Sequence, residues 1–418
     1  MAIAAGRARQ EQVYRDGVSG RRPRVPTSAA ELERRGRRAM SRRADAYVGG
    51  GAGAEATMRA NRAAFDRWET VPRVLRDVGT RDHSVDLFGR RHEHPLLLAP
   101  IGALDLVRRD ADLEVARGAA AAGVPMIVSN QAGAAMESLA GVGRRWFQLY
   151  WSTSDELVDS FLARAEASGC EAVVVTLDTT MLGWRPRDLD LGHLPFSRGL
   201  GIAQYTSDPV FARLARERAA APRSGPAPRV TPAAVRTLLE ISRHHPGRAL
   251  DNLRSPVPRA AVETFLDVYS RPQLSWDDIA TLRSRTALPV VLKGVLHPDD
   301  ARRAVDAGVD AVLVSNHGGR QVDHAVAALD ALPGVVEAVA DRMPVLLDSG
   351  VRTGGDVALA LALGARAVCL GRPFTWGLAL AGAAGVAQVV SDVLAELDLT
   401  VGLAGVRSAA ELEVRRRY

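Results

Sequence analysis

The feature that most constrains the fold is an alternation of short apolar runs with helical stretches, repeated eight times along the chain. Apolar runs of four to eight residues bounded by turn signals are typical of buried strands, and strands that alternate with helices are typical of parallel βαβ units. The predicted strands span residues 95–102, 125–130, 145–151, 171–178, 289–294, 311–316, 344–350 and 367–372. The predicted helices lie near residues 110–122, 133–140, 154–168, 276–286, 298–307, 325–341, 354–363 and 375–396.

Polar residues follow nearly all of these runs, and their distribution favours one of two folds. Eight such units predict an α/β fold of the (β/α)8 TIM barrel type, in which the chemistry gathers at the C-terminal ends of the strands. A doubly wound open sheet is the alternative, but it would concentrate the polar residues at a switch point. We therefore expect one barrel domain over residues 28–418 with an N-terminal helical extension.

The segments outside the repeat predict the remaining organisation. Residues 1–27 are rich in Arg, Gly and Pro and are expected to form an arm on the surface or on a neighbouring subunit. Helices are expected over residues 28–48 and 54–68, and a small hairpin over residues 84–94. Residues 179–272, after the fourth strand, are expected to be a long, irregular and mobile lid over the barrel mouth, because long loops in compact domains are usually functional or disordered.

Composition excludes several classes of protein. No apolar stretch is expected to span a membrane, and the N-terminus lacks the apolar run of a secretory signal. Cys170 and Cys369 make no disulfide framework, which favours a reducing cytoplasm. The net charge of +6 suggests nucleic-acid binding, but the basic residues are spread among Asp and Glu without an aromatic-basic motif, so we expect none. No His or Cys cluster predicts a metal.

The stretch from Ala311 to Asp323 carries the strongest chemical signal. A buried strand ends there in Ser315, Asn316, His317, two glycines and Arg320. A titratable group and a fixed cation thus lie at one strand end, and the glycines allow the backbone to approach a ligand closely.

Lys293 is the only lysine in the chain. It lies at the end of an apolar run rather than on a surface helix. A lysine is a compact point charge that fits a tight site, so Lys293 is predicted to serve the site directly.

The last two strands predict a phosphate site. Barrels commonly bind phosphate after strands seven and eight. The chain has Asp348, Gly350 and Arg352 after one strand and Gly371 and Arg372 after the next. Small residues expose backbone N–H groups to an anion, and arginines bind it bidentately.

The other strand ends suggest a heteroaromatic cofactor and a carboxylate substrate. Neutral polar groups suited to a heteroatom-rich ring are Ser129, Gln148 and Thr176, and Lys293 would place a positive charge beside a ring that becomes anionic on reduction. The residues left for the substrate are His317, Arg320, Tyr150, Asp178, Arg185 and Tyr47. Arginines and tyrosines fit a carboxylate, and a histidine with an aspartate fits a general base.

Five motifs together resemble the FMN-dependent L-2-hydroxy acid oxidase and dehydrogenase family. They are SNHGGRQ, QLYW, TLDT with LGWRPRDL, DSGVRTGGDV and ALALGARAVCLGRPFTWGLA. The resemblance covers about residues 28–400 and is greatest to the lactate 2-monooxygenase branch.

The resemblance implies FMN as cofactor and a role for each candidate residue. His317 would be the catalytic base and Asp178 would orient it. The substrate would be bound by Arg320, Arg185, Tyr47 and Tyr150. FMN would be held by Pro100, Gly102, Ser129, Gln148, Thr176, Lys293, Ser315, Asp348, Gly350, Arg352, Gly371 and Arg372.

The implied reaction is oxidation of a lactate-like L-2-hydroxy acid with O2. It would yield a keto acid and hydrogen peroxide, or, if the product is retained under a closed lid, a decarboxylated acid. The relatives imply a homo-oligomer, a tetramer or octamer. Departures from the family pattern at GGGAG, LDLVRRDADLE and SNQAGAAME leave a larger aryl or biosynthetic 2-hydroxy acid open as substrate. An FMN-dependent isomerase and a binding protein without turnover are the more remote alternatives.

Overall fold

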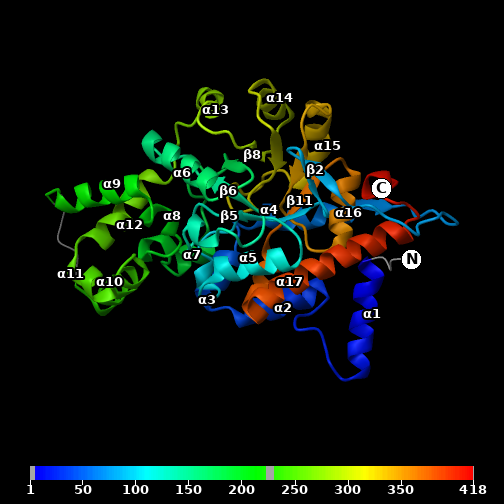
Figure 1. Cartoon of the computed structure of the whole chain (residues 1–418), viewed down its shortest axis with the longest axis horizontal. Coiled ribbons are helices and arrows are strands. Elements are labelled where there is room, and N and C mark those ends of the chain that lie inside the picture. Colours follow the sequence, from blue (N-terminus) through cyan, green and yellow to red (C-terminus); the bar gives the residue numbers. More distant parts are fainter. Residues whose placement is uncertain (1–4, 223–229, 418) are drawn as a thin grey trace.

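The computed structural model describes residues 5–222 and 230–417, and its centre is a closed barrel of eight parallel strands (Figure 1). Neighbouring strands follow one another in sequence, and the eighth closes on the first. The prediction of a TIM barrel is therefore confirmed, and the open sheet is excluded. The strands are β4 (Leu96–Leu98), β5 (Met126–Val128), β6 (Arg145–Leu149), β7 (Val173–Thr176), β8 (Val290–Val295), β9 (Ala311–Val314), β10 (Val345–Leu347) and β11 (Ala367–Leu370).

The outer helices agree with the prediction except at one place. They are α5 (Ala111–Ala121), α6 (Asp155–Ala167), α13 (Trp276–Leu282), α14 (Pro298–Asp306), α15 (Ala328–Val339), α16 (Gly354–Ala362) and α17 (Arg372–Leu403). The helix predicted near residues 133–140 is wrong, because only a 3-10 turn, Met136–Leu139, forms between β5 and β6.

The N-terminal extension is more divided than predicted. The expected helix over residues 28–48 is two helices, α2 (Ala29–Ala39) and α3 (Arg42–Gly49), because Met40 is extended and Ser41 accepts a hydrogen bond from the Ala44 N–H as a new N-cap. The second predicted helix is α4 (Ala56–Ala63). It is followed by β1 (Trp68–Thr70), which pairs with β12 (Val414–Arg416). Within the predicted arm, α1 (Ala5–Val18) packs on α17.

The described part of the segment 179–272, which excludes residues 223–229, is a helical lobe rather than an irregular loop. It contains α7 (Pro186–Asp190), α8 (Ala203–Thr206), α9 (Pro209–Ala220), α10 (Pro232–His244), α11 (Ala249–Arg254) and α12 (Val257–Val268). The lobe projects from one side of the barrel (Figure 1). It is anchored there by the buried Tyr205 hydroxyl, which donates to Asn130 Oδ1 at 2.8 Å. The expectation of an irregular segment was therefore wrong for the described residues, and its mobility and its role as a lid stay predictions.

The N-terminal end of the barrel is closed by apolar side chains. The predicted hairpin forms as β2 (Val85–Leu87) and β3 (Arg90–His92). Its buried Leu87 joins the residues inside the barrel, and the Phe88 ring lies 5.4 Å from the Trp146 ring between centroids. Access to the barrel interior is therefore from the opposite, C-terminal end.

Helix α17 is long and apolar enough to cross a membrane by length and composition, contrary to the sequence expectation. Among the described residues no other helix meets this test. In the protein α17 packs against α1, α2, α5 and α16, and it is interrupted at Ala381 and Gly382, where the backbone leaves the helical region. These contacts are those of a core helix.

Candidate active site

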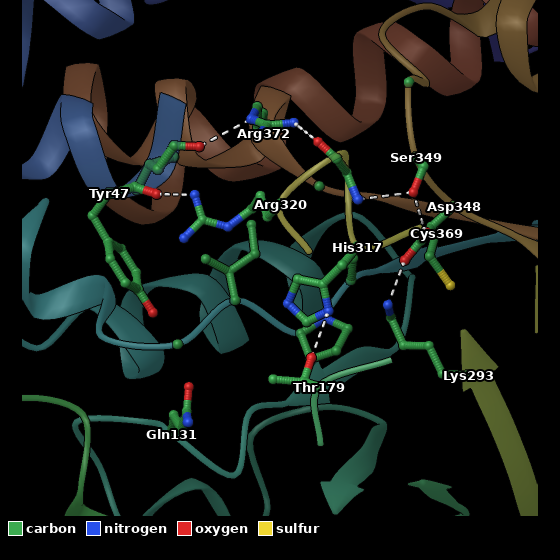
Figure 2. Close-up of a pocket in the computed structure, with 18 of the residues that line it drawn as sticks. Tyr47, Gln131, Thr179, Lys293, His317, Arg320, Asp348, Ser349, Cys369 and Arg372 are labelled. Carbon is green, nitrogen blue, oxygen red and sulfur yellow. Dashed lines mark hydrogen bonds and ion pairs between the residues drawn. The ribbon is translucent and has the colours of Figure 1, made fainter. Parts of the chain in front are cut away.

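A cavity opens at the C-terminal ends of the barrel strands and brings most of the predicted site residues together. It contains about 900 Å³ of space not occupied by atoms, part of which is open solvent. The predicted residues that line it are Tyr47, Pro100, Gly102, Tyr150, Arg185, Lys293, His317, Arg320, Asp348, Gly350, Arg352, Gly371 and Arg372. Figure 2 shows part of the lining of this cavity, with ten of its residues labelled.

His317 is held as a neutral base. Its Nδ1 lies 2.9 Å from Asp178 Oδ1 and 3.3 Å from Thr179 Oγ1, and Thr179 donates to the same carboxylate oxygen. An Nδ1–H that donates to Asp178 leaves Nε2 as the proton acceptor. Burial lowers the pKa of His317, and Lys293 and Arg185 lower it further against the opposing effect of Asp178. The ring is therefore unprotonated near neutral pH.

Asp178 lies behind His317 rather than on the cavity wall. Burial alone would raise the pKa of this carboxyl, but His317 and Lys293 hold it well below its usual range. The carboxylate is thus ionised throughout the neutral range. It can stabilise a proton that His317 acquires.

Two arginines face the cavity beside His317. Arg185 Nε donates to the Arg320 backbone oxygen at 3.2 Å, and the Arg320 guanidinium lies 4.9 Å from the centroid of the Tyr47 ring. Enclosure by protein, together with the neighbouring Arg185, lowers the pKa of Arg320 to about 10. The two like charges favour an anion between them.

The predicted phosphate site contains two more arginines at the start of α17 and after β10. Arg372 donates to the backbone oxygens of Val48, Gly318 and Gly50, at 2.9 to 3.0 Å. Enclosure, with Arg352 and Arg320 nearby, holds the pKa of Arg372 well below its usual value. The N-terminus of α17 adds the positive end of a helix dipole.

None of these four arginines has a carboxylate partner among the described residues, although most enclosed cations in proteins do. The residues concerned are Arg185, Arg320, Arg352 and Arg372. Such a set fits two anionic groups, a substrate carboxylate near Arg320 and a cofactor phosphate near Arg372. FMN has the required phosphate, so the cavity fits the cofactor that the sequence implied.

Lys293 is buried and faces the same cavity. Burial alone would lower its pKa, but Asp348 and Asp178 hold it above the usual value. Its Nζ lies 3.3 Å from Asp348 Oδ2 and donates to Ser315 Oγ at 2.8 Å. The ammonium is therefore a fixed positive charge at the cavity floor, suited to stabilise a reduced ring.

Four predicted cofactor contacts lie outside the cavity lining. Ser129 donates to Gln148 Oε1 at 2.9 Å, and Gln148 Nε2 donates to Thr176 Oγ1 at 3.0 Å. Ser315 is occupied by Lys293 and by the His317 N–H. These side chains bond one another at the strand ends, and direct contact with FMN stays a prediction for them.

Sequence reasoning missed several residues of the site. Thr179 directly follows Asp178, and Ser349 lies inside the predicted phosphate motif, so their positions could have indicated them. Gln131 and Leu182 follow strand ends without a distinctive pattern. The lining residues that lie inside predicted stretches without a role of their own are Ile101, Gly318, Ser349 and Val351, and those missed altogether are Val48, Ala99, Gln131, Thr179, Leu182 and Cys369.

Comparisons with known proteins agree with this geometry. Residues 36–416 match the family model described as FMN-dependent dehydrogenase. The chain is 41% identical over 406 residues to the FMN-dependent alpha-hydroxy acid dehydrogenase qulF of Penicillium citrinum, covering 96% of this chain and 93% of the relative. It is 40% identical over 365 residues to an L-lactate oxidase of Lysinibacillus sphaericus, covering 87% and 85%.

Solved structures of mandelate oxidase are also similar to this chain. A mandelate oxidase crystal structure with (S)-4-hydroxymandelic acid superposes with a TM-score of 0.77 at 36% identity, covering 94% of this chain and 99% of that chain. The two chains are therefore similar in sequence as well as in fold.

Proposed function

This chain is a member of the FMN-dependent dehydrogenase family and an FMN-dependent oxidoreductase of 2-hydroxy acids, and from this we propose a role for each residue of its site. FMN, when bound, accepts two electrons from the substrate and passes them to dioxygen. Arg352, Arg372 and the N-terminus of α17 would hold its phosphate, and Lys293 would lie beside its ring. The pairing of His317 with Asp178 carries this proposal, because His317 lies on the wall of a cavity whose arginines have no carboxylate partner among the described residues.

The substrate carboxylate would bind between Arg320 and Arg185. Tyr47 and Tyr150 line the same cavity, and burial raises the pKa of both phenols, so each keeps its hydroxyl proton as a donor. His317 Nε2 would then take a proton from the bound 2-hydroxy acid. Asp178 would stabilise the imidazolium that forms.

We propose a small, lactate-like acid as the leading substrate, in line with the L-lactate oxidases among the relatives. A larger aryl 2-hydroxy acid is the second candidate, because Val48, Ile101 and Leu182 form an apolar part of the wall and Leu182 is 40% exposed. One relative at 37% identity is a 4-hydroxymandelate oxidase of Amycolatopsis orientalis.

We further propose the keto acid and hydrogen peroxide as products. The decarboxylating outcome was expected from a closed lid over residues 179–272. Within the described part of that segment, only Thr179, Leu182 and Arg185 line the cavity, which weakens the argument for product retention.

Anaerobic mixing of the purified flavoprotein with a panel of L-2-hydroxy acids tests the substrate. Loss of visible flavin absorption with lactate supports the leading candidate, and loss only with mandelate supports the second. Air is then admitted, and pyruvate with peroxide is measured against acetate. No reduction by any member of the panel would refute the assigned roles.

We also propose a homo-oligomer, a tetramer or octamer. Three large apolar side chains near the cavity mouth are mostly exposed in the single chain, with Met181 at 67%, Trp184 at 73% and Val322 at 65%, and exposed apolar patches often mark interfaces. Light scattering coupled to size-exclusion chromatography measures the mass. A monomer at micromolar concentration would refute the proposal.

A further inference from the structure

His317 has a backbone conformation that ordinary residues avoid. Its φ is +58°, in the left-handed region, which costs a residue with a Cβ roughly 1–2 kcal/mol. Such a conformation persists only where the surroundings over-determine it. The contacts that fix the peptides on either side of His317 therefore matter for the direction of its ring.

One set of contacts comes from the barrel. Ser349 Oγ accepts hydrogen bonds from the N–H groups of Asn316 and Gly318, at 3.3 and 3.0 Å, and donates to Asp348 Oδ1 at 2.8 Å. Figure 2 shows this chain of contacts, which runs from the loop after β9 through Ser349 and Asp348 to Lys293. The loop after β9 is thus attached to the loop after β10.

The second set comes from α4, which lies outside the barrel. Asn61 Nδ2 donates to Asn316 Oδ1 at 2.8 Å, and Asn316 Nδ2 donates to Asn61 Oδ1 at 2.7 Å. Both side chains are buried, with 2% and 4% exposure. Asn316 Oδ1 also accepts from the Gly319 N–H at 3.1 Å, and Asn61 Oδ1 from the Ala328 N–H. The amide pair therefore fixes Asn316, which precedes His317, and the N–H of Gly319, two residues after it.

The close approach of α4 depends on two glycines. A Cβ at Gly319 would lie 2.6 Å from Met58 N, and a Cβ at Gly350 would lie 2.5 Å from Asn61 O. Both glycines have positive φ. The backbone of α4 thus rests directly on the loops that carry His317 and the predicted phosphate site.

We propose that Asn61 is a positioning residue for His317, acting through Asn316. Asn61 does not line the cavity, so it acts on the reaction only through the direction of the His317 ring. The inference rests on the proposed function, in which His317 is the base. Loss of the amide pair lets the loop relax from its left-handed conformation and moves Nε2 away from the substrate.

The test compares Asn61→Ala and the milder Asn61→Ser with Thr57→Val in the flavin-bound protein. Thr57 is a matched control, because it is buried on the same helix and bonds Val322 and Ala325 but not the peptides flanking His317. We expect both Asn61 variants to reduce kcat for anaerobic flavin reduction, the alanine by about 10- to 100-fold, with KM within about twofold. Thr57→Val should leave kcat within about twofold.

Two further measurements separate positioning from general damage. Hydrogen exchange of the peptide containing residues 315–320 should become faster in the Asn61 variants and stay unchanged in Thr57→Val. In a His317→Asn background, Asn61→Ala should cause no further loss of rate, because residues that act through one another are non-additive.

An equal loss of rate in both backgrounds, or unchanged rate and exchange in both Asn61 variants, would overturn the proposal. The single variant His317→Asn distinguishes this failure from failure of the proposed function. If His317→Asn alone reduces flavin at the normal rate, the assignment of the base is wrong, whatever the exchange data show about Asn61.

Discussion

The two ends of the barrel are built on opposite principles. At the N-terminal end, Leu87, Phe88 and Trp146 close the barrel with apolar contacts. At the C-terminal end, the cavity is surrounded by arginines without a carboxylate partner among the described residues, by a buried lysine, and by His317 with its left-handed backbone conformation. Enclosed charges and strained backbone conformations, as at the C-terminal end, lower the stability of a protein and support its chemistry. We therefore expect stability and activity in this chain to be separable by position along the strands.

The largest difference between loss of activity and loss of stability is expected for His317→Asn at the C-terminal end. Loss of the general base should slow flavin reduction by roughly 10²- to 10⁴-fold. The melting temperature and the bound FMN should be unchanged, since the substituted side chain remains polar and similar in size. Stopped-flow absorbance and thermal unfolding measure the two quantities, and a large fall in melting temperature would contradict the separation.

Leu87→Ala at the N-terminal end should lower the stability of the protein and leave the rate of flavin reduction unchanged. The side chain is 1% exposed, and truncation of a buried leucine destabilises a protein by roughly 2–5 kcal/mol. Chemical denaturation measures the loss. The rate of flavin reduction per folded molecule should stay within about twofold, and a slower rate would show that the two ends are coupled.

Arg372→Met tests the cost of an enclosed cation without a carboxylate partner. Affinity for FMN should fall by roughly 10- to 100-fold, the loss of a charge-assisted hydrogen bond of about 1.5–3 kcal/mol. The melting temperature of the apoprotein should fall little, because relief of the repulsion from Arg352 and Arg320 offsets the lost hydrogen bonds to the backbone.

Arg81→Met is the matched control for that experiment. Arg81 pairs with the buried Asp398 at 2.7 Å, and breaking a buried pair costs about 3–5 kcal/mol. This control should destabilise the fold and leave FMN affinity unchanged. If the two arginine variants lost the same stability and the same affinity for FMN, the proposed difference between Arg372 and Arg81 would be refuted.

The smallest effect is the pH dependence of flavin reduction. The pKa of His317 lies below its usual 6.5, and the reaction needs the neutral ring, so the rate should be constant at neutral pH. Below the pKa it should fall about tenfold per pH unit. Asp178 raises the pKa, so Asp178→Asn should move this acid limb to lower pH. A shift to higher pH would contradict the assigned pair.

The strands and the ring of site residues could be predicted because both follow from local patterns. A short apolar run followed by polar residues marks a strand and its C-terminal end, and the barrel brings those ends together. His317, Arg320 and Lys293 were therefore found from sequence alone. The bonding of Ser129, Gln148 and Thr176 to one another was not, because side-chain direction depends on neighbouring strands.

The lobe and Asn61 were missed for different reasons. Arg- and Pro-rich composition concealed the helices of the lobe, although Asp208 before Pro209 and Thr231 before Pro232 are N-cap signals that mark α9 and α10. Asn61 lies 255 residues from its partner Asn316, and no local pattern relates residues so far apart.

The pairing of β1 with β12 has a consequence for biosynthesis. The strand that follows α4 is held by the last residues of the chain, with Trp68 opposite Arg416. During translation the N-terminal segment emerges first, but this pairing forms only after residues 414–416 have left the ribosome. A nascent chain therefore exposes the edge of β1 until residues 414–416 emerge. Ribosome-bound chains arrested before Val414 should be more sensitive to protease near residue 70 than chains in which β12 has paired with β1.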